Sequence, residues 1–141
     1  MKDQAEETLI GAANQVARKR RLVVVVSSDR TFAESLRSHL AGEFDVLLAR
    51  DGGEAAAKAQ AVTVDIALVD LGSPVLGMSA LARMKNVEPA PIICALALPE
   101  APSAQAQFDF DYVLARPETG VDLPERVRFI LTKAESKSEE N

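Results

Sequence analysis

Five short apolar runs, separated by stretches of helical periodicity, are the feature that most constrains the fold of this chain. The runs are rich in Val, Ile and Leu and lie at about 21–27, 44–49, 65–70, 91–97 and 111–115. Apolar residues recur with helical spacing at roughly 30–42, 52–61, 77–86 and 123–136. Strands that are apolar along their whole length are typical of a parallel sheet covered by helices on both faces. The pattern therefore predicts an α/β fold with a doubly wound, five-stranded parallel sheet.

The two ends of the chain and one connecting segment fall outside this pattern. Residues 1–20 carry apolar side chains on one side of a predicted helix, which indicates either a linker or a helix for a partner or dimer. Residues 21–133 form the predicted domain, and the charged stretch 134–141 is expected to be disordered. Pro99 and Pro102 argue against a long helix between the fourth and fifth strands.

Composition excludes several classes of function. With 141 residues, 48% of them hydrophobic, and a formal charge of −5, we expect a soluble domain that does not bind nucleic acid or anionic membranes directly. Cys94 is the single cysteine and His39 the single histidine, which excludes an intrachain disulfide and a histidine metal cage. No apolar stretch is long enough for a transmembrane segment, so a cytoplasmic location is expected.

Polar side chains gather where the first and third predicted strands end. Ser27, Ser28 and Asp29 follow the first strand, and Asp70 closes the third. In a doubly wound sheet of order 2-1-3-4-5, the crevice for ligands lies between these two strands, at their carboxyl ends. The four side chains are therefore predicted to converge on one site. Asp29 is also suited to cap the helix that begins near residue 30.

Five segments, taken in their order and spacing, resemble the receiver domain of bacterial two-component response regulators. The resemblance covers roughly 21–133 and rests on VVVVSSDRTFAESLRSHL, DGGEAAAKA, DIALVDLGSPVLGMSAL, PIICALA and DYVLARP. It implies the flavodoxin-like, CheY-like fold and a signalling role rather than an enzymatic one. It also implies that Asp70 holds the phospho-acceptor position and that the Gly72 carbonyl, together with Asp70, would ligate Mg²⁺ if the site still binds it.

The first departure from the family concerns this metal site. Ser27 and Ser28 stand where the family has an acidic pair, and the neighbouring acid, Asp29, lies one residue further along. Mg²⁺ is usually held by one or two carboxylates together with waters and phosphate oxygens. Neutral hydroxyl groups are much poorer ligands, so Mg²⁺ is expected to bind weakly at best.

Two further departures concern the groups that would contact a phosphoryl group. The family's switch hydroxyl is replaced by Leu96, or by Ala95 or Ala97 in a shifted register, and none of these side chains can donate a hydrogen bond. Arg116 occupies the position of the family's lysine, and a planar guanidinium is not equivalent to a compact ammonium. A salt bridge from Arg116 to Asp70 is predicted, and it would hold the site in one state.

These departures favour a pseudo-receiver, a receiver-like domain of two-component or phosphorelay signalling that has lost Mg²⁺-dependent phosphorylation of its aspartate. Such a domain acts through contacts with other proteins, because a receiver's output depends on which surface docks. Its partner would be a kinase, an output domain or another signalling protein, and a homodimer stays open. No cofactor is expected.

Two alternatives also stay open. The first is an atypical response regulator that is still phosphorylated on Asp70, with the neighbouring acid and the arginine partly replacing the missing groups. The second is a flavodoxin-like cofactor-binding protein, since Ser27, Ser28 and Thr31 lead into a helix amino terminus, where phosphate groups bind well. That loop contains no glycine, which such phosphate-binding loops usually need for close backbone approach.

Overall fold

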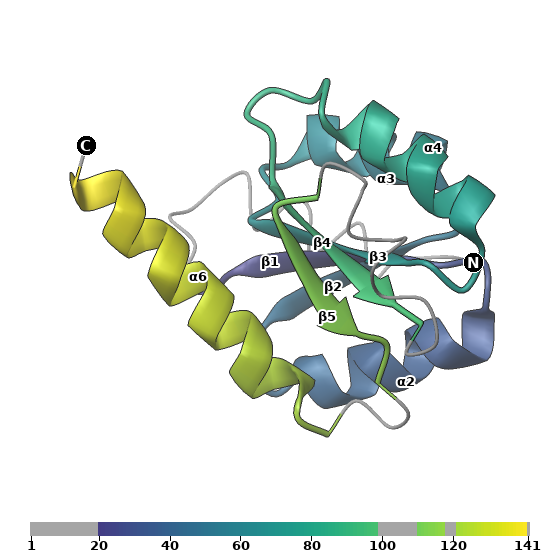
Figure 1. Cartoon of the computed structure of the whole chain (residues 1–141), viewed down its shortest axis with the longest axis horizontal. Coiled ribbons are helices and arrows are strands. Elements are labelled where there is room, and N and C mark those ends of the chain that lie inside the picture. Colours follow the sequence, from purple (N-terminus) through teal and green to yellow (C-terminus); the bar gives the residue numbers. More distant parts are fainter. Residues whose placement is uncertain (1–19, 99–109, 118–120, 141) are drawn as a thin grey trace.

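The computed structural model describes residues 20–98, 110–117 and 121–140, which are built around a five-stranded sheet (Figure 1). All strands are parallel, and their order is β2-β1-β3-β4-β5. The strands are β1 (Leu22–Val26), β2 (Asp45–Ala49), β3 (Ile66–Asp70), β4 (Ile92–Ala97) and β5 (Tyr112–Ala115). The predicted doubly wound sheet of order 2-1-3-4-5 is confirmed, and each strand lies within one residue of its predicted bounds.

Helices cover both faces of the sheet, as the apolar strands predict. They are α2 (Arg30–Leu40), α3 (Gly52–Ala61), α4 (Pro74–Met84) and α6 (Leu123–Glu140). The pair α3 and α4 packs on one face, and the pair α2 and α6 packs on the other (Figure 1). Within the described ranges, no helix is both long enough and apolar enough to cross a membrane.

The inner strands β1, β3 and β4 are buried from both sides, which explains their unbroken apolar sequences. Every residue of β1 and of β3 is buried. Successive side chains of a strand point to opposite faces, so Val24 and Val26 pack on the side of α3 and α4, whereas Val23 and Val25 pack on the side of α2 and α6. β1, β2, β3 and β4 thus contribute to both cores, whereas the edge strand β5 packs against the core of α2 and α6, through Tyr112 and Leu114.

The start of α4 differs from its prediction. Apolar periodicity predicts a helix from about residue 77, but α4 begins at Pro74. The Ser73 side chain accepts a hydrogen bond from the Leu76 backbone N–H and thereby caps the helix. Proline suits the first helical turn because the N–H that it lacks would have no partner within the helix there. The cap and the proline therefore set this boundary, and the apolar stripe begins only after them.

The carboxyl-terminal stretch is a second correction. Charged composition predicts disorder from residue 134, but α6 continues to Glu140. Ala134 and Glu135 are good helix formers, and Glu135 also forms an ion pair with Arg21, just before β1. This pair ties α6, at Glu135, to the residue that precedes β1. The predictions made for 1–19 and 99–109 lie outside the described residues.

Candidate functional site

Three strand ends deliver polar side chains to one edge of the sheet. Asp70 is the last residue of β3, and Ser27 and Arg116 directly follow β1 and β5. Because the strands are parallel, these carboxyl ends lie at the same edge, where open α/β folds place their binding sites. Ser27 and Asp70 are also the buried polar residues of the described part of the chain. The buried polar side chains are therefore gathered at the predicted site.

The Asp70 carboxylate accepts four hydrogen bonds from the protein itself. Its Oδ1 accepts from the Gly72 backbone N–H at 2.8 Å and from Arg116 Nε at 2.7 Å. Its Oδ2 accepts from the Ser27 hydroxyl at 2.7 Å and from Arg116 Nη2 at 3.3 Å. A carboxylate offers about four lone-pair positions. The surrounding side chains and backbone thus occupy the acceptor capacity of Asp70.

Arg116 is the residue that covers Asp70. Its two N–H donors meet the two carboxylate oxygens in the fork geometry that suits guanidinium and carboxylate, so the predicted salt bridge is confirmed. Arg116 also reaches α2: Nη2 lies 3.7 Å from Asp29 Oδ2, and Cζ lies 3.7 Å from the centroid of the Phe32 ring. Helical periodicity places Phe32 on the inner face of its helix. It does not predict that Arg116, which follows β5, stacks on the Phe32 ring.

The electrostatics of the pair favour two charged groups. Burial disfavours the ionised form of Asp70, but the Arg116 guanidinium, the Gly72 N–H and the Ser27 hydroxyl outweigh it and lower the pKa of Asp70. The hydrogen bond to Asp70 likewise raises the pKa of Arg116, against the opposing effect of its own burial. The site therefore holds a carboxylate and its counter-cation at neutral pH, both supplied by the chain.

Of the three residues that follow β1, two take part in the site. Ser27 is buried and, besides donating to Asp70, accepts a hydrogen bond from the Asp29 backbone N–H at 3.0 Å. Asp29 caps α2, with Oδ1 accepting from the Phe32 N–H at 3.0 Å, as predicted. Ser28 is exposed and is not among the groups that contact Asp70 in the described structure. The predicted convergence of four side chains is therefore wrong for Ser28.

The strand register places Leu96 beside the site. Leu96 pairs with Asp70 across β3 and β4, and its backbone carbonyl accepts a hydrogen bond from the Leu71 N–H at 3.0 Å. Its side chain is fully buried in the core under α2 and α6. The register therefore sets Leu96, rather than Ala95 or Ala97, opposite Asp70, and no hydroxyl is available from that position.

The donor set at this edge does not fit a hard divalent cation. Mg²⁺ requires several oxygen ligands and is usually attracted by carboxylate charge. Here Asp70 is neutralised by Arg116, and the described residues contain no cluster of three or more His, Cys, Asp or Glu side chains that could hold a metal. The Gly72 carbonyl and the Ser27 hydroxyl add no charge. Weak Mg²⁺ binding therefore stays a prediction, which the charge of this donor set supports.

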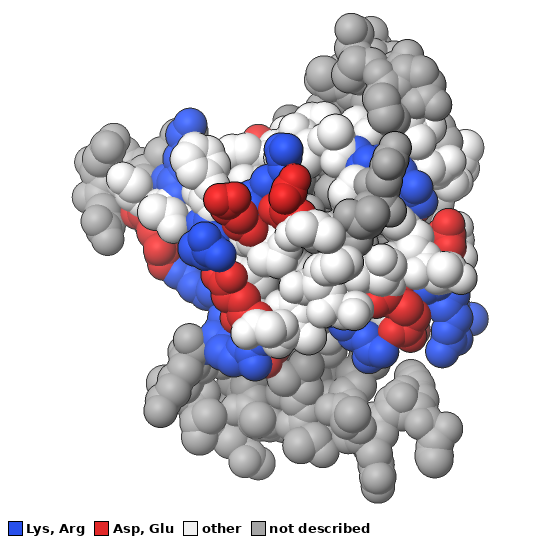
Figure 2. Space-filling view, turned by 90° about the horizontal axis from the view of Figure 1, so that it is seen from below, with Lys and Arg blue, Asp and Glu red and all other residues white. Residues whose placement is uncertain are grey.

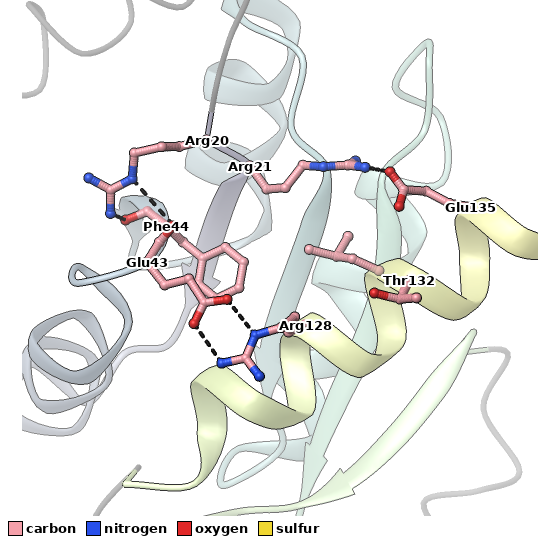
Figure 3. Close-up of a pocket in the computed structure, with 8 residues that line it drawn as sticks. Arg20, Arg21, Glu43, Phe44, Arg128, Thr132 and Glu135 are labelled. Atoms are coloured by element: carbon pink, nitrogen blue, oxygen red, sulfur yellow. Dashed lines mark hydrogen bonds and ion pairs between the residues drawn. The ribbon is translucent and has the colours of Figure 1, made fainter.

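A cavity of about 260 Å³ lies near the amino ends of β1 and β2, whereas Asp70 lies at the carboxyl end of β3 (Figure 3). It is lined by residues that precede β1, by the turn after α2 and by one flank of α6: Arg20, Arg21, Glu43, Phe44, Arg128, Leu131, Thr132 and Glu135. Arg128 donates to both Glu43 oxygens, at 2.6 and 2.8 Å. Figure 2, which views the molecule from below Figure 1, likewise shows basic and acidic side chains interspersed. Charged side chains that line the cavity are therefore already paired with each other.

No protein-family model and no curated protein matches the chain. Solved structures do match it. A CheY-like response regulator receiver domain protein from Methanospirillum hungatei JF-1 has a TM-score of 0.66 and 22% identity, over 84% of this chain and 99% of that one. The signal receiver domain of an HD domain-containing protein from Pseudomonas fluorescens Pf-5 has a TM-score of 0.70 and 20% identity, over 89% and 97%.

A third structure is described as one of a family of redox sensors in the streptococci that evolved from two-component response regulators. It has a TM-score of 0.70 and 17% identity, over 86% of this chain and 55% of that one. At such identities the likeness establishes the fold. The chain therefore has the CheY-like receiver fold that its sequence predicts.

Proposed function

We propose that this chain is a pseudo-receiver, a receiver-like signalling domain that acts through protein–protein contacts without Mg²⁺-dependent phosphorylation of Asp70. One observation carries the proposal: both oxygens of Asp70 are engaged by groups of the chain itself, with Arg116 in bidentate contact. Phosphorylation would require one of these oxygens to attack a phosphoryl group. That attack would first have to break hydrogen bonds to Arg116, Gly72 or Ser27.

Charge gives a second reason. Phosphoryl transfer depends on cations that neutralise the developing charge, and the cation nearest to Asp70 is a guanidinium that forms an ion pair with it. A carboxylate that is already neutralised attracts Mg²⁺ only weakly, and Ser27 supplies a hydroxyl rather than a second carboxylate. Leu96 adds no hydrogen-bond donor for a phosphoryl oxygen. The lack of a second carboxylate at Ser27 and of a donor at Leu96 therefore adds to the reason that the ion pair gives.

A role in protein contacts is supported by the surface. Large apolar side chains are exposed in the described structure, and Val75 and Met78 lie three residues apart on α4, where side chains of one helix are neighbours. Exposed apolar groups mark interaction sites when they cluster. The exposed residues are Val75 and Met78 on α4, Val113 on β5, Val121 in the turn before α6, and Phe129 on α6. We propose a kinase, an output domain or another signalling protein as the partner, with a second copy of the chain as a further candidate.

The decisive test is direct. A ¹⁵N-labelled sample is titrated with Mg²⁺ and then with beryllofluoride, a mimic of the phosphoryl group, and its intact mass is measured after incubation with acetyl phosphate. We expect no shifts centred on Asp70 and Gly72 and no gain in mass. A stable phosphate on Asp70, absent from the Asp70→Asn variant, would sink the proposal.

That outcome would support the second candidate, an atypical response regulator that is still phosphorylated. One observation favours it: Asp29 Oδ2 lies 3.7 Å from Arg116, so a second carboxylate is already close to the site. If Arg116 moved away, Asp29 and Asp70 would be the two acids nearest to an incoming cation. An Asp29→Asn variant separates the two candidates, because it removes this charge and keeps a side chain that caps helices well.

A further inference from the structure

The Arg116 guanidinium is fixed by more than its ion pair with Asp70. Its Cζ lies 3.7 Å from the centroid of the Phe32 ring, well within the distance of a cation–π contact. Phe32 belongs to the first turn of α2 and packs against the core beneath α2 and α6. The ring is therefore a fixed platform that comes from a different element than Arg116 and Asp70.

The stacking also orients the guanidinium. Its N–H donors lie in the plane of the group, so a ring on one face leaves those donors to point sideways. Arg116 uses them for the two Asp70 oxygens, at 2.7 and 3.3 Å, and the same Nη2 lies 3.7 Å from Asp29 Oδ2. An arginine side chain has several rotatable bonds, and holding it in one conformation costs entropy. Contact with the Phe32 ring reduces the number of conformations that the Arg116 side chain can adopt.

Asp29 contributes to the same arrangement from the same turn. Its Oδ1 accepts the hydrogen bond that caps α2, and its Oδ2 faces Arg116. The first turn of α2 thus presents a carboxylate and an aromatic ring to one guanidinium. The capping bond fixes Asp29 relative to Phe32, since the donor is the Phe32 backbone N–H.

We propose that Phe32 is a positioning residue of the Asp70 site: it holds Arg116 in place, so the first turn of α2 controls how firmly the carboxylate is covered. This inference rests on the proposed function, because it names the element that regulates the covered site. It assigns to Phe32 a role that burial alone does not require. A leucine would fill much of the same space and would lack the π face.

The test compares three variants of the full chain by NMR. Phe32→Leu removes the π system and stays apolar, Phe32→Tyr keeps the π system, and Asp29→Asn keeps the cap and removes the charge. The readouts are the solvent exchange rate of the Arg116 Nε–H, identified by its absence in Arg116→Lys, and the shift of the Gly72 amide, which donates to Asp70 at 2.8 Å. Thermal melting is recorded for every variant.

In Phe32→Leu we expect Arg116 Nε–H exchange to accelerate about two- to fivefold, the factor that corresponds to an exposed cation–π contact. The Gly72 amide should shift in the same variant, whereas Phe32→Tyr should match the wild type in both readouts. Asp29→Asn should accelerate exchange by a smaller factor, because its oxygen lies beyond hydrogen-bond distance. A purely structural role would lower the melting temperature and leave the exchange rate unchanged.

Equal exchange rates in the wild type, Phe32→Leu and Phe32→Tyr would overturn the inference, and so would equal acceleration in both Phe32 variants. These outcomes are independent of whether the chain is phosphorylated. The proposed function is decided by the mass of the wild type after acetyl phosphate, whereas the role of Phe32 is decided by Arg116 exchange without phosphate donor. The failure of one is therefore distinguishable from the failure of the other.

Discussion

At Asp70, the difference between arginine and lysine decides how the carboxylate is covered. A lysine ammonium is a point charge on a flexible stem, whereas a guanidinium presents two parallel N–H donors in one plane. Arg116 uses this geometry to bond both Asp70 oxygens and still offers a flat face to Phe32. A lysine at this position could not make both contacts at once. Arginine at this position therefore covers the acid more fully than a lysine would.

The first prediction concerns acid. Because the pKa of Asp70 is lowered in the native state, its ionised form stabilises the fold. This contribution is complete above the unfolded-state pKa of about 3.9 and is lost as the pH falls through the lower native value. The difference in unfolding free energy between the wild type and Asp70→Asn, measured by urea denaturation, should therefore shrink on acidification below about pH 4. A difference that stays constant over the same range would contradict the lowered pKa.

The second prediction concerns Arg116 itself. In Arg116→Ala, burial still disfavours the Asp70 carboxylate, while only the Gly72 N–H and the Ser27 hydroxyl still favour it. The pKa of Asp70 should therefore rise relative to the wild type, which a ¹³C NMR titration of its carboxyl carbon would measure. Arg116→Lys is the matched control, because it keeps the charge and loses the fork, and it should give a smaller rise. An unchanged pKa in Arg116→Ala would mean that the ion pair does not set the charge state.

The third prediction concerns Ser27, whose hydroxyl donates to Asp70 Oδ2 at 2.7 Å. Ser27→Asp replaces this donor by a like charge, so the unfolding free energy should fall by at least about 1–3 kcal/mol, the cost of a buried charged group without its donor. Ser27→Ala removes the donor without adding charge and should cost less. Mg²⁺ should recover stability in the double variant Ser27→Asp/Arg116→Lys but not in the single variant Ser27→Ala. Equal urea midpoints for the two single variants would count against charge repulsion.

Sequence patterns predicted part of this site for identifiable reasons. Asp70, Ser27 and Arg116 directly close or follow strands, and parallel strand ends must meet at one edge, so topology alone brings them together. The stacking of Arg116 on Phe32 depends instead on how far the arginine side chain reaches from the end of β5 to α2. The spacing of residues along the sequence does not predict this distance. Ser28 lies in the bend between β1 and α2 and is exposed, because the alternation of side chains along a strand does not extend to a residue in a bend.

Among the elements, α3 and α4 approach each other closely at Gly52, a residue without a side chain. A Cβ on Gly52 would lie 2.7 Å from the Cα of Ala80, a backbone atom that can move only with its helix. Gly53, the next residue, has room: its Cβ would lie 3.5 Å from Asp51 Oδ1, an ordinary contact. The glycine pair that opens α3 therefore contains one position set by packing and one that is not.

The fourth prediction follows from this pair. Gly52→Ala must push α3 and α4 apart and is expected to lower the unfolding free energy by about 1–3 kcal/mol, as overpacking of a filled core does. Gly53→Ala, the matched control in the same turn, should stay within about 0.5 kcal/mol of the wild type. Urea denaturation of both variants measures the difference. If Gly52→Ala were as stable as Gly53→Ala, the two helices would have to separate at no cost.

Helix boundaries show which local signals outweigh periodicity. The cap by Ser73 and the proline after it start α4 earlier than the apolar stripe does. At the other end of the chain, charged composition suggested disorder, but a composition rule does not consider that Glu135 can bind Arg21. Boundaries therefore depend on single hydrogen bonds and ion pairs, whereas the existence of each helix depends on its whole apolar face.

For the molecule as a whole, topology was readable because the sheet is buried on both faces. Strands with two cores need apolar residues at every position, and this requirement separates them from amphipathic strands in the sequence alone. The sheet therefore separates the two cores and contributes side chains to both of them. Within the sheet, β4 lies between β3 and β5. Opening either core should therefore disturb the other, as expected for a single cooperative unit.

The last prediction uses Cys94, the single cysteine, as a reporter of that unit. Cys94 is fully buried in β4 and pairs with Tyr112 of the edge strand β5, and burial raises the pKa of its thiol to about 12. Native protein should therefore react with a thiol reagent about 10³- to 10⁶-fold more slowly than the unfolded chain, because only the small fraction of molecules that are open at any time can react. Leu36→Ala, in the same core, should accelerate labelling by the factor that matches its loss of unfolding free energy. Labelling that is fast and insensitive to both urea and Leu36→Ala would instead mean that β5 detaches alone, and the sheet would then be two units rather than one.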